Sequence, residues 1–278
     1  STVTVFLAGA LHEAGYSVAV LDADSTNHGL AAALGVDPEP DPLLDHFGGM
    51  VFSGGRVTCP VDDPTPLAAA RIDLGELSGR FAGQNPEGVR LLVAGKLGDL
   101  GPGAGCDGPV AKIARDLRVA GLGPRPVTVL DFKAGFEDAA RGALTTVDWA
   151  LVVVDPTTAA VRMAHHMASM VADIRRGVPP ATRHLDRPEL VELAERQFRE
   201  ARVRGVATVL NRIGSTESEA YLREALEGSG APVAAVFPES PPVAGQWLRG
   251  ERLHDPRVGE AAGALVQALE RMVRHPEV

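Results

Sequence analysis

The feature that most constrains the fold is an alternation of short apolar runs with amphipathic segments. Six short, continuous apolar runs are typical of buried strands: Val18–Leu21, Val89–Val93, Val127–Leu130, Ala150–Val154, Val206–Leu210 and Val233–Phe237. Segments with helical spacing accompany them, near Val3–Ala14, Val110–Leu117, Ala159–Arg175, Leu190–Arg204, Glu217–Glu227 and Gly259–Arg274. The alternation predicts an α/β fold, a mainly parallel sheet with helices on both faces, in a single domain over residues 1–278.

One stretch interrupts this alternation. Residues 38–108 are rich in Pro, Gly and Asp and include the sequences FGGMVFSGG and CPVDDPTP. A region of this length without regular structure is usually either functional or disordered. We favour a functional region, because short apolar runs occur inside it.

Composition argues against several classes of protein. No apolar run approaches the length of a membrane span, and no signal peptide is present, so we expect a cytoplasmic protein that does not bind membranes. A formal net charge of −9 argues against nonspecific binding to nucleic acid. The two cysteines, Cys59 and Cys106, do not make a disulfide framework.

Acidic residues stand where two of the predicted strands end. Asp22 and Asp24 follow the first apolar run, and Asp131 follows the third. Ligands bind at the carboxyl ends of strands in open α/β sheets. Carboxylates there suit a Mg²⁺ shell and the positioning of an attacking water in phosphoryl transfer. Solvated acids at strand ends would give the same pattern, so both interpretations stay open on these residues alone.

Three further places fit the same chemistry. Ser1 would bind Mg²⁺ if it ended a phosphate-binding loop of the pattern G-x-x-x-x-G-K-[ST]; otherwise Ser1-Thr2 is a plain helix cap. Gly135, in FKAG, could bring its N–H close to a γ-phosphate, because glycine lets the backbone approach closely. Asn211 follows VATVL and offers both a donor and an acceptor, which suits the edge of adenine, a turn or a cap.

In this order and spacing the motifs resemble the deviant-Walker P-loop ATPases of the MinD/ParA type. They are most similar to the CooC-like branch, the nickel-insertion accessory ATPases of carbon monoxide dehydrogenase. Ser1-Thr2 resembles the end of the K-G-G-x-G-K-[ST]-[ST] loop, VLDAD the switch I strand and DFKAGFEDAARG the switch II segment. VLNRI resembles the base-contacting N-[KR] motif, and VFPES resembles the late proline loop. The similarity extends over nearly the whole chain.

The resemblance implies a P-loop NTPase that binds and hydrolyses ATP with Mg²⁺, acts as a homodimeric switch, and assists maturation or metal loading of a metalloenzyme client. It implies that Ser1 holds Mg²⁺ directly, while Asp22 and Asp131 act through water. Asp24 takes the place of the catalytic acid that orients the attacking water.

The resemblance also assigns the nucleotide contacts. Thr2 lies with Ser1 at the phosphates, and Gly135 is expected at the γ-phosphate. Asn211, Arg212 and Pro238 are expected at the base.

A first, central strand and a phosphate loop with both of its lysines would precede Ser1 in such a protein. The resemblance therefore implies that this chain is truncated before Ser1. ATPase activity is expected of the full-length protein and stays open for the chain that begins at Ser1.

The chain departs from the branch at its metal motif. Ala104 stands where a C-x-C motif has its first cysteine, so a dimer would bring together two copies of Cys106 in place of four thiolates. Cys106 is a candidate ligand for Ni or Zn, with Cys59 as a helper; the alternative is that each is a small buried apolar residue. We expect no tightly held metal, and we expect the loop Gly103–Pro109 to serve mainly as a dimer or partner contact. Lys133 is either a surface residue or a phosphate contact.

Two other functions stay open. One is a ParA/MinD-like positioning ATPase that acts as a binding switch, and the other is an ATP-dependent ligase-type enzyme with a small substrate in the 38–108 region. The C-terminal segment GALVQALERMVRHPEV has few basic residues and no Trp or Phe anchor, which gives little support to membrane docking.

Overall fold

The computed structural model describes residues 1–97 and 106–274. Its strands are β1 (Ser17–Asp22), β2 (Arg71–Asp73), β3 (Gly83–Gln84), β4 (Arg90–Val93), β5 (Arg118–Ala120), β6 (Pro126–Asp131), β7 (Trp149–Val154), β8 (Gly205–Ile213) and β9 (Val233–Pro238). The six predicted strands are all confirmed, as β1, β4, β6, β7, β8 and β9.

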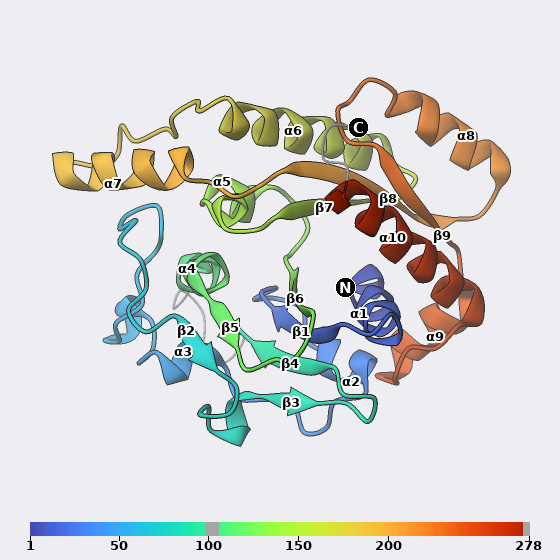
Figure 1. Cartoon of the computed structure of the whole chain (residues 1–278), viewed down its shortest axis with the longest axis horizontal. Helices are drawn as coiled ribbons and strands as arrows, with labels where there is room; N and C mark the ends of the chain where they lie inside the picture. The colour runs from blue at the N-terminus through green and yellow to red at the C-terminus, as the bar shows by residue number, and fades with distance from the viewer. Residues whose placement is uncertain (98–105, 275–278) are drawn as a thin grey trace.

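The helices are α1 (Thr2–Glu13), α2 (Leu30–Leu34), α3 (Leu43–His46), α4 (Gly108–Asp116), α5 (Glu137–Ala140), α6 (Thr158–Arg175), α7 (Pro188–Arg199), α8 (Thr216–Ala225), α9 (Pro241–Arg249) and α10 (Pro256–Arg274). Short 3₁₀ turns add η1 (Val51–Ser53), η2 (Gly79–Phe81) and η4 (Ala143–Thr145). Figure 1 shows how these elements are arranged. The predicted α/β fold is confirmed.

One predicted helix is too long. The amphipathic pattern predicts helix to Arg204, but α7 ends at Arg199. The N–H groups of Arg202 and Arg204 donate to the carbonyls of Thr145 and Asp148. These bonds draw the chain into an extended path that enters β8, so tertiary contacts override the helical pattern.

The strands form separate sheets. One sheet has the order β3-β4-β1-β6, in which β1 is parallel to both β4 and β6 and only β3 is antiparallel. A second has the parallel order β7-β8-β9, and β2 pairs with β5 in a third. The irregular region 38–108 thus contains β2, β3 and β4 together with α3 and two 3₁₀ turns, as its short apolar runs predict.

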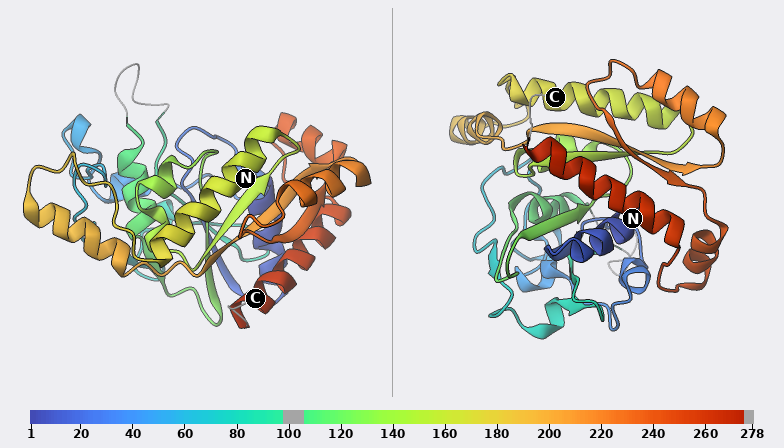
Figure 2. Two further views of the ribbon diagram at one scale, coloured as in Figure 1. Left: turned by 90° about the horizontal axis from the view of Figure 1, so that it is seen from above. Right: turned by 45° about the vertical axis from the view of Figure 1, so that its right-hand side comes forward.

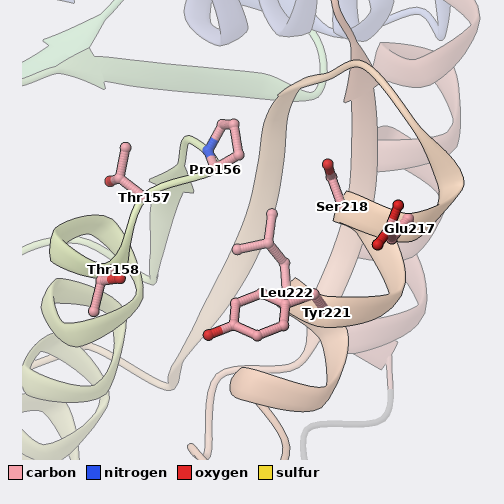
Figure 3. A pocket seen from close by; sticks show the side chains of 7 residues that line it. All are labelled: Pro156, Thr157, Thr158, Glu217, Ser218, Tyr221 and Leu222. Carbon is pink, nitrogen blue, oxygen red and sulfur yellow. The ribbon is translucent and has the colours of Figure 1, made fainter.

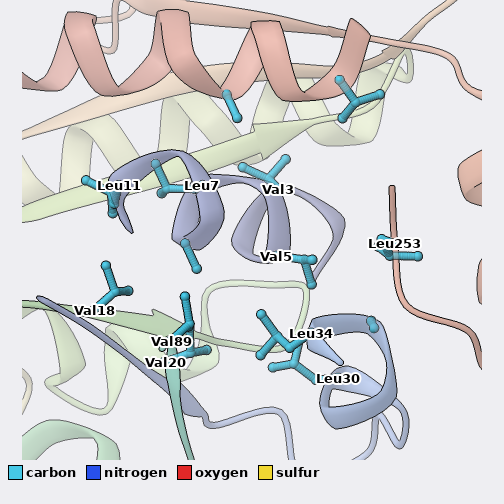
Figure 4. Close-up of a cluster of buried hydrophobic side chains, with 14 of the residues drawn as sticks. Val3, Val5, Leu7, Leu11, Val18, Val20, Leu30, Leu34, Val89 and Leu253 are labelled. Atoms are coloured by element: carbon cyan, nitrogen blue, oxygen red, sulfur yellow. The ribbon is translucent and has the colours of Figure 1, made fainter. Parts of the chain in front are cut away.

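Helix α1 shows how the sequence builds the main core. Val3, Leu7 and Leu11 recur at helical spacing and are all buried, and the chain turns at Gly15, whose φ of 84° favours glycine. Helix α10 lies alongside α1 (Figures 1 and 2). Figure 4 shows this apolar cluster, in which Val18 and Val20 of β1 meet α1. The cluster also includes residues of β8 and β9, so it spans both large sheets.

Two smaller cores cover the opposite faces. Helices α6 and α8 pack on the β7-β8-β9 sheet, and helices α3 and α4 pack near β1 and β4. Helices therefore lie on both faces of the sheets, which places the carboxyl ends of the strands at an edge that loops can reach.

Strands β6 and β7 each have one unpaired edge. Among the described residues β6 pairs only with β1, and β7 pairs only with β8. Residues 127–130 of β6 are half-buried although their neighbours in β1 are fully buried, and Val153 of β7 is 43% exposed. Val127, Val129 and Leu151 nevertheless pack against the same core. Both large sheets therefore pack against the same core. Among the described residues, each of these sheets has an unpaired edge, at β6 or at β7.

Candidate functional site

Four predicted site residues gather at the carboxyl ends of β1 and β6, near the start of α1. We call Ser1, Asp22, Asp24, Lys96 and Asp131 the acidic cluster. Parallel pairing aligns Asp22 with Asp131. The hydroxyl of Ser1 donates to Asp131 Oδ2 at 2.7 Å, and buried Thr4 Oγ1 donates to Asp131 Oδ1 at 2.6 Å. The first turn of α1 is therefore bonded to the end of β6.

Lys96 completes the cluster, although the sequence motifs do not indicate it. Its Nζ lies 2.7 Å from Asp22 Oδ2, and it also donates to the carbonyl oxygens of Asp24, at 2.8 Å, and Asn27. Asn27 Nδ2 in turn donates to Ser1 Oγ at 2.9 Å. The lysine side chain is only 6% exposed. One buried ammonium thus joins a strand-end carboxylate to the turn that follows it.

Asp24 is held with one oxygen engaged. Its Oδ1 accepts from the backbone N–H of Thr26, the hydroxyl of Thr26 and the backbone N–H of Asn27. Among the described residues Oδ2 has no hydrogen-bond donor, so it is available to orient a water. Burial acts to raise the pKa of Asp24, but the bonds from Thr26 and Asn27 outweigh it, and the pKa lies below its ordinary value. Asp24 is thus ionised at neutral pH.

At Asp22 the effect of burial prevails, and the pKa lies above its ordinary value. The residue is 1% exposed, and loss of solvent raises its pKa from 3.8 to about 6, against the opposing effect of Lys96. The nearby charge of Asp131 acts in the same direction as burial. A cation at this position would relieve the repulsion between the two carboxylates.

The donor atoms of this cluster are of the kind that Mg²⁺ prefers. Ser1, Asp22 and Asp131 offer a hydroxyl and carboxylate oxygens, and Mg²⁺ usually takes one or two carboxylates together with waters and phosphate oxygens. Within residues 1–97 and 106–274, no group of three or more His, Cys, Asp and Glu forms a metal cluster. The residues therefore fit a Mg²⁺ that phosphate helps to hold, and do not form an all-protein metal cage.

A second group of predicted residues lies at the carboxyl end of β8. We call Asp155, Asn211 and Arg212 the Asn211 cluster. Asp155 Oδ1 accepts from Asn211 Nδ2 at 2.8 Å, and Asp155 Oδ2 accepts from Arg212 Nη2 at 2.5 Å. Pro238 ends the neighbouring strand β9 and is aligned with Ile213. The structure thus brings Asn211, Arg212 and Pro238 to the ends of adjacent strands.

Trp247 of α9 contacts the start of α1. Its Nε1 donates to Thr2 Oγ1 at 2.9 Å, and its ring lies beside Gly29, where a Cβ would be 3.7 Å away. Helix α9 begins three residues after Pro238. This bond ties the segment after β9 to the helix that carries Ser1 and Thr2.

The segment after Asp131 is bonded to α4. Lys133 Nζ pairs with Asp107 Oδ2, and Arg141 Nη1 lies 2.7 Å from Asp107 Oδ1. Lys133 is predicted to be either a surface residue or a phosphate contact. In the structure it forms a partly buried ion pair with Asp107. Gly135 has a φ of 113°, a backbone conformation that residues with a side chain rarely adopt, so the turn favours glycine. Its predicted phosphate contact stays a prediction.

The two cysteines lie together at Gly108, where α4 begins. Cys106 precedes α4, where its sulfur accepts from the N–H of Gly108 at 3.3 Å. Buried Cys59 packs on the same glycine, since a Cβ at 108 would lie 2.6 Å from Cys59 Sγ. Burial raises the pKa of the Cys59 thiol. Ala104 and the part of the Gly103–Pro109 loop up to residue 105 lie outside the described residues.

A surface pocket lies between the start of α6 and the first turns of α8, and its lining begins at Pro156, which follows Asp155 in the chain (Figure 3). It is lined by Pro156, Thr157, Thr158, Glu217, Ser218, Tyr221 and Leu222. None of the predicted site residues lines it. No helix in the described part of the chain is both long and apolar enough to cross a membrane.

Comparison with known families identifies the domain. Residues 1–253 match the CobQ/CobB/MinD/ParA nucleotide binding domain. The chain belongs to this family. The resemblance seen in the sequence is thereby confirmed at the level of the family, and the carboxyl-end location of both clusters is the place where such α/β folds bind ligands.

Individual relatives are more distant. An uncharacterized ATP-binding protein of Methanocaldococcus jannaschii is 27% identical over 59% of this chain and 65% of its own length. The carbon monoxide dehydrogenase accessory protein CooC of Rhodospirillum rubrum is 28% identical over 63% of this chain and 65% of its own length. The chain therefore spans less than two thirds of these relatives.

The structure of the septum site-determining protein MinD from Pyrococcus horikoshii, complexed with Mg-ADP, is similar with a TM-score of 0.59. The identity is 18%, over 100% of this chain and 93% of that chain. This likeness supports the fold.

Sequence reasoning missed Lys96, Asn27 and Asp155. Lys96 and Asp155 each follow a strand, β4 and β7 respectively. The same rule that indicates Asp22 and Asp131 could have indicated them. Asn27 lies in a turn and gives no such signal.

Proposed function

We propose that this protein is a dimeric switch that binds and hydrolyses ATP with Mg²⁺ and assists the maturation or metal loading of a metalloenzyme. The observation that carries the proposal is the acidic cluster, in which Ser1, Asp22, Asp24 and Asp131 meet at the start of α1. Family membership supports nucleotide binding. The similarity to CooC supports the maturation role and the CooC-like branch.

Four members of the acidic cluster, Ser1 and the three aspartates, have a proposed task. Bound Mg²⁺ would neutralise charge on the phosphates. Ser1 would bind it directly, with Asp22 and Asp131 acting through water. Asp24 would orient the attacking water with its unengaged Oδ2. The positive end of α1 favours an anion near Ser1.

A second function has support from the fold. A MinD/ParA-like positioning ATPase uses the same domain, and the similarity to MinD covers the whole chain. The two functions share the nucleotide site and differ in the client. They are distinguished in cells that lack the protein: loss of nickel or zinc from one metalloenzyme supports maturation, whereas a displaced cargo with normal metal content supports positioning.

Phosphate release in Mg²⁺ tests the nucleotide part of the proposal. The protein made from its complete reading frame should hydrolyse ATP, and Ser1→Ala should reduce the rate at least tenfold because a Mg²⁺ ligand is lost. Ser17→Ala, at the far end of β1, is the matched control and should leave the rate unchanged. Equal rates in all three proteins would contradict the role of Ser1.

A further inference from the structure

We propose that Asp155 is a positioning residue that fixes the Asn211 amide so that its carbonyl oxygen faces the base, and that this selects adenine over guanine. The inference rests on the proposed nucleotide site and adds to it the residue that sets base specificity. Its starting point is the geometry of the Asn211 cluster.

Strand pairing places the two side chains together. Strands β7 and β8 are parallel, with Val154 aligned to Leu210, so that Asp155 and Asn211 are the next residues along each strand. Asp155 Oδ1 lies 2.8 Å from Asn211 Nδ2. Both side chains are therefore fixed by the sheet at its carboxyl end, where Pro238 also lies.

The chemistry of the pair decides the orientation of the amide. An ionised carboxylate can only accept hydrogen bonds, so the atom of Asn211 that faces it must be the NH₂ group. The carbonyl oxygen Oδ1 is then directed away from Asp155 and is available as an acceptor. Adenine presents an amino group at position 6, whereas guanine presents a carbonyl oxygen there. An acceptor at this position binds the amino group of adenine and repels the carbonyl oxygen of guanine.

The backbone of β8 supports a specialised role. The pairing of β8 with β9 shifts between Leu210 and Ile213, and Arg212 has a φ of 56°, a conformation that residues other than glycine rarely adopt. Such irregularities redirect side chains beside functional sites. Asp155 Oδ2 holds Arg212 at 2.5 Å, so a single carboxylate fixes both residues of the irregular segment.

Solvent exposure makes a purely structural role for this pair less suitable. The side chains of Asp155 and Arg212 are 32% and 65% exposed. Ion pairs this exposed contribute little to stability. Variants at Asp155 should therefore fold, which makes base recognition measurable.

The experiment compares ATP and GTP as competitors of a ribose-labelled fluorescent ATP analogue, with the protein made from its complete reading frame. The parent should prefer ATP. Asp155→Ala should lower the ratio of the two affinities about tenfold, because the amide is free to turn and offer its NH₂ group to guanine. Asp155→Asn should lower it further, since its own NH₂ can donate to Asn211 Oδ1 and favour the turned amide.

Asp148→Asn, the same change at the amino end of β7, is the matched control and should keep the parent ratio. Within residues 1–97 and 106–274, the ion-pair contact of its carboxylate is a long one to Arg202, at 3.9 Å. A normal ratio in both Asp155 variants, or an equal loss of both nucleotides, would overturn the inference and leave the nucleotide site in place. A folded parent that binds neither nucleotide would overturn the nucleotide site and the inference together.

Discussion

The acidic cluster and the Asn211 cluster are both built at the carboxyl ends of parallel strands, yet their surroundings differ. The ion pair of Asp22 and Lys96 has side chains 2% and 6% exposed, whereas Asp155 and Arg212 are 32% and 65% exposed. In the buried cluster, the groups proposed for chemistry also stabilise the fold. In the exposed cluster, recognition can change while stability stays the same.

Removal of Lys96 should have the largest effect on stability. Lys96→Met leaves the Asp22 carboxylate buried without its partner, which should lower the free energy of unfolding by about 3–5 kcal/mol. Urea unfolding followed by circular dichroism measures this change. The double variant with Asp22→Asn, which removes both charges, should recover most of the loss. A double variant as unstable as the single one would show that the charge pair is not the cause.

Asp24 should separate chemistry from binding within the same cluster. Asp24→Asn keeps an oxygen for the bonds from Thr26 and Asn27 but loses the charge that would orient the water. We expect kcat for ATP to fall about 100-fold or more, with nucleotide affinity unchanged. Single-turnover hydrolysis and equilibrium binding test the two parts. Hydrolysis at the parent rate would mean that another group positions the water.

The pH dependence of stability should differ between the parent and Asp22→Asn. The folded state holds the Asp22 proton up to a pKa of about 6, whereas the unfolded chain releases it near 3.8. The folded state therefore binds more protons between these values, and stability falls as pH rises from about 4 to 6. This loss in the free energy of unfolding amounts to about 3 kcal/mol, and it should be absent in Asp22→Asn.

Unfolding in EDTA at several pH values measures this difference between the parent and Asp22→Asn. Asp107 offers a control of opposite sign. Burial acts to raise its pKa, but Lys133 and Arg141 outweigh burial and hold the pKa below its ordinary value. Its contribution to stability is lost as pH falls below about 4. A constant difference between the parent and Asp22→Asn from pH 4 to 6 would contradict the proposed burial of that charge.

The sequence predicts the strands well because their signal is local. Each is a continuous apolar run, and the acids that follow β1 and β6 mark the carboxyl edge. The helix-rich second half is also predicted, except that Arg202 and Arg204 form backbone bonds to a distant segment that no helical pattern reveals.

The partners of the site residues are not local, and this is where sequence reasoning fails. Lys96 reaches Asp22 only because β4 pairs with β1, across 74 positions of chain. Lys133 meets Asp107 through a contact between α4 and the segment after β6. The open edges of β6 and β7 depend on sheet order, which apolar runs leave undetermined.

Substitution of Arg212 should have the smallest effect on the free energy of unfolding. The ion pair of Arg212 with Asp155, at 2.5 Å, is similar in length to that of Lys96 with Asp22, at 2.7 Å, but its side chains are 65% and 32% exposed. Solvent screens the attraction, and each long side chain loses freedom when the pair forms, so Arg212→Gln should change the free energy of unfolding by less than about 1 kcal/mol. The same urea titration used for Lys96→Met measures it. Because the pair also holds a left-handed backbone position, Arg212→Gly should be no less stable than Arg212→Gln. A loss of several kcal/mol in Arg212→Gln would show that exposure does not separate the two clusters, and that the Asn211 cluster supports the fold as the acidic cluster does.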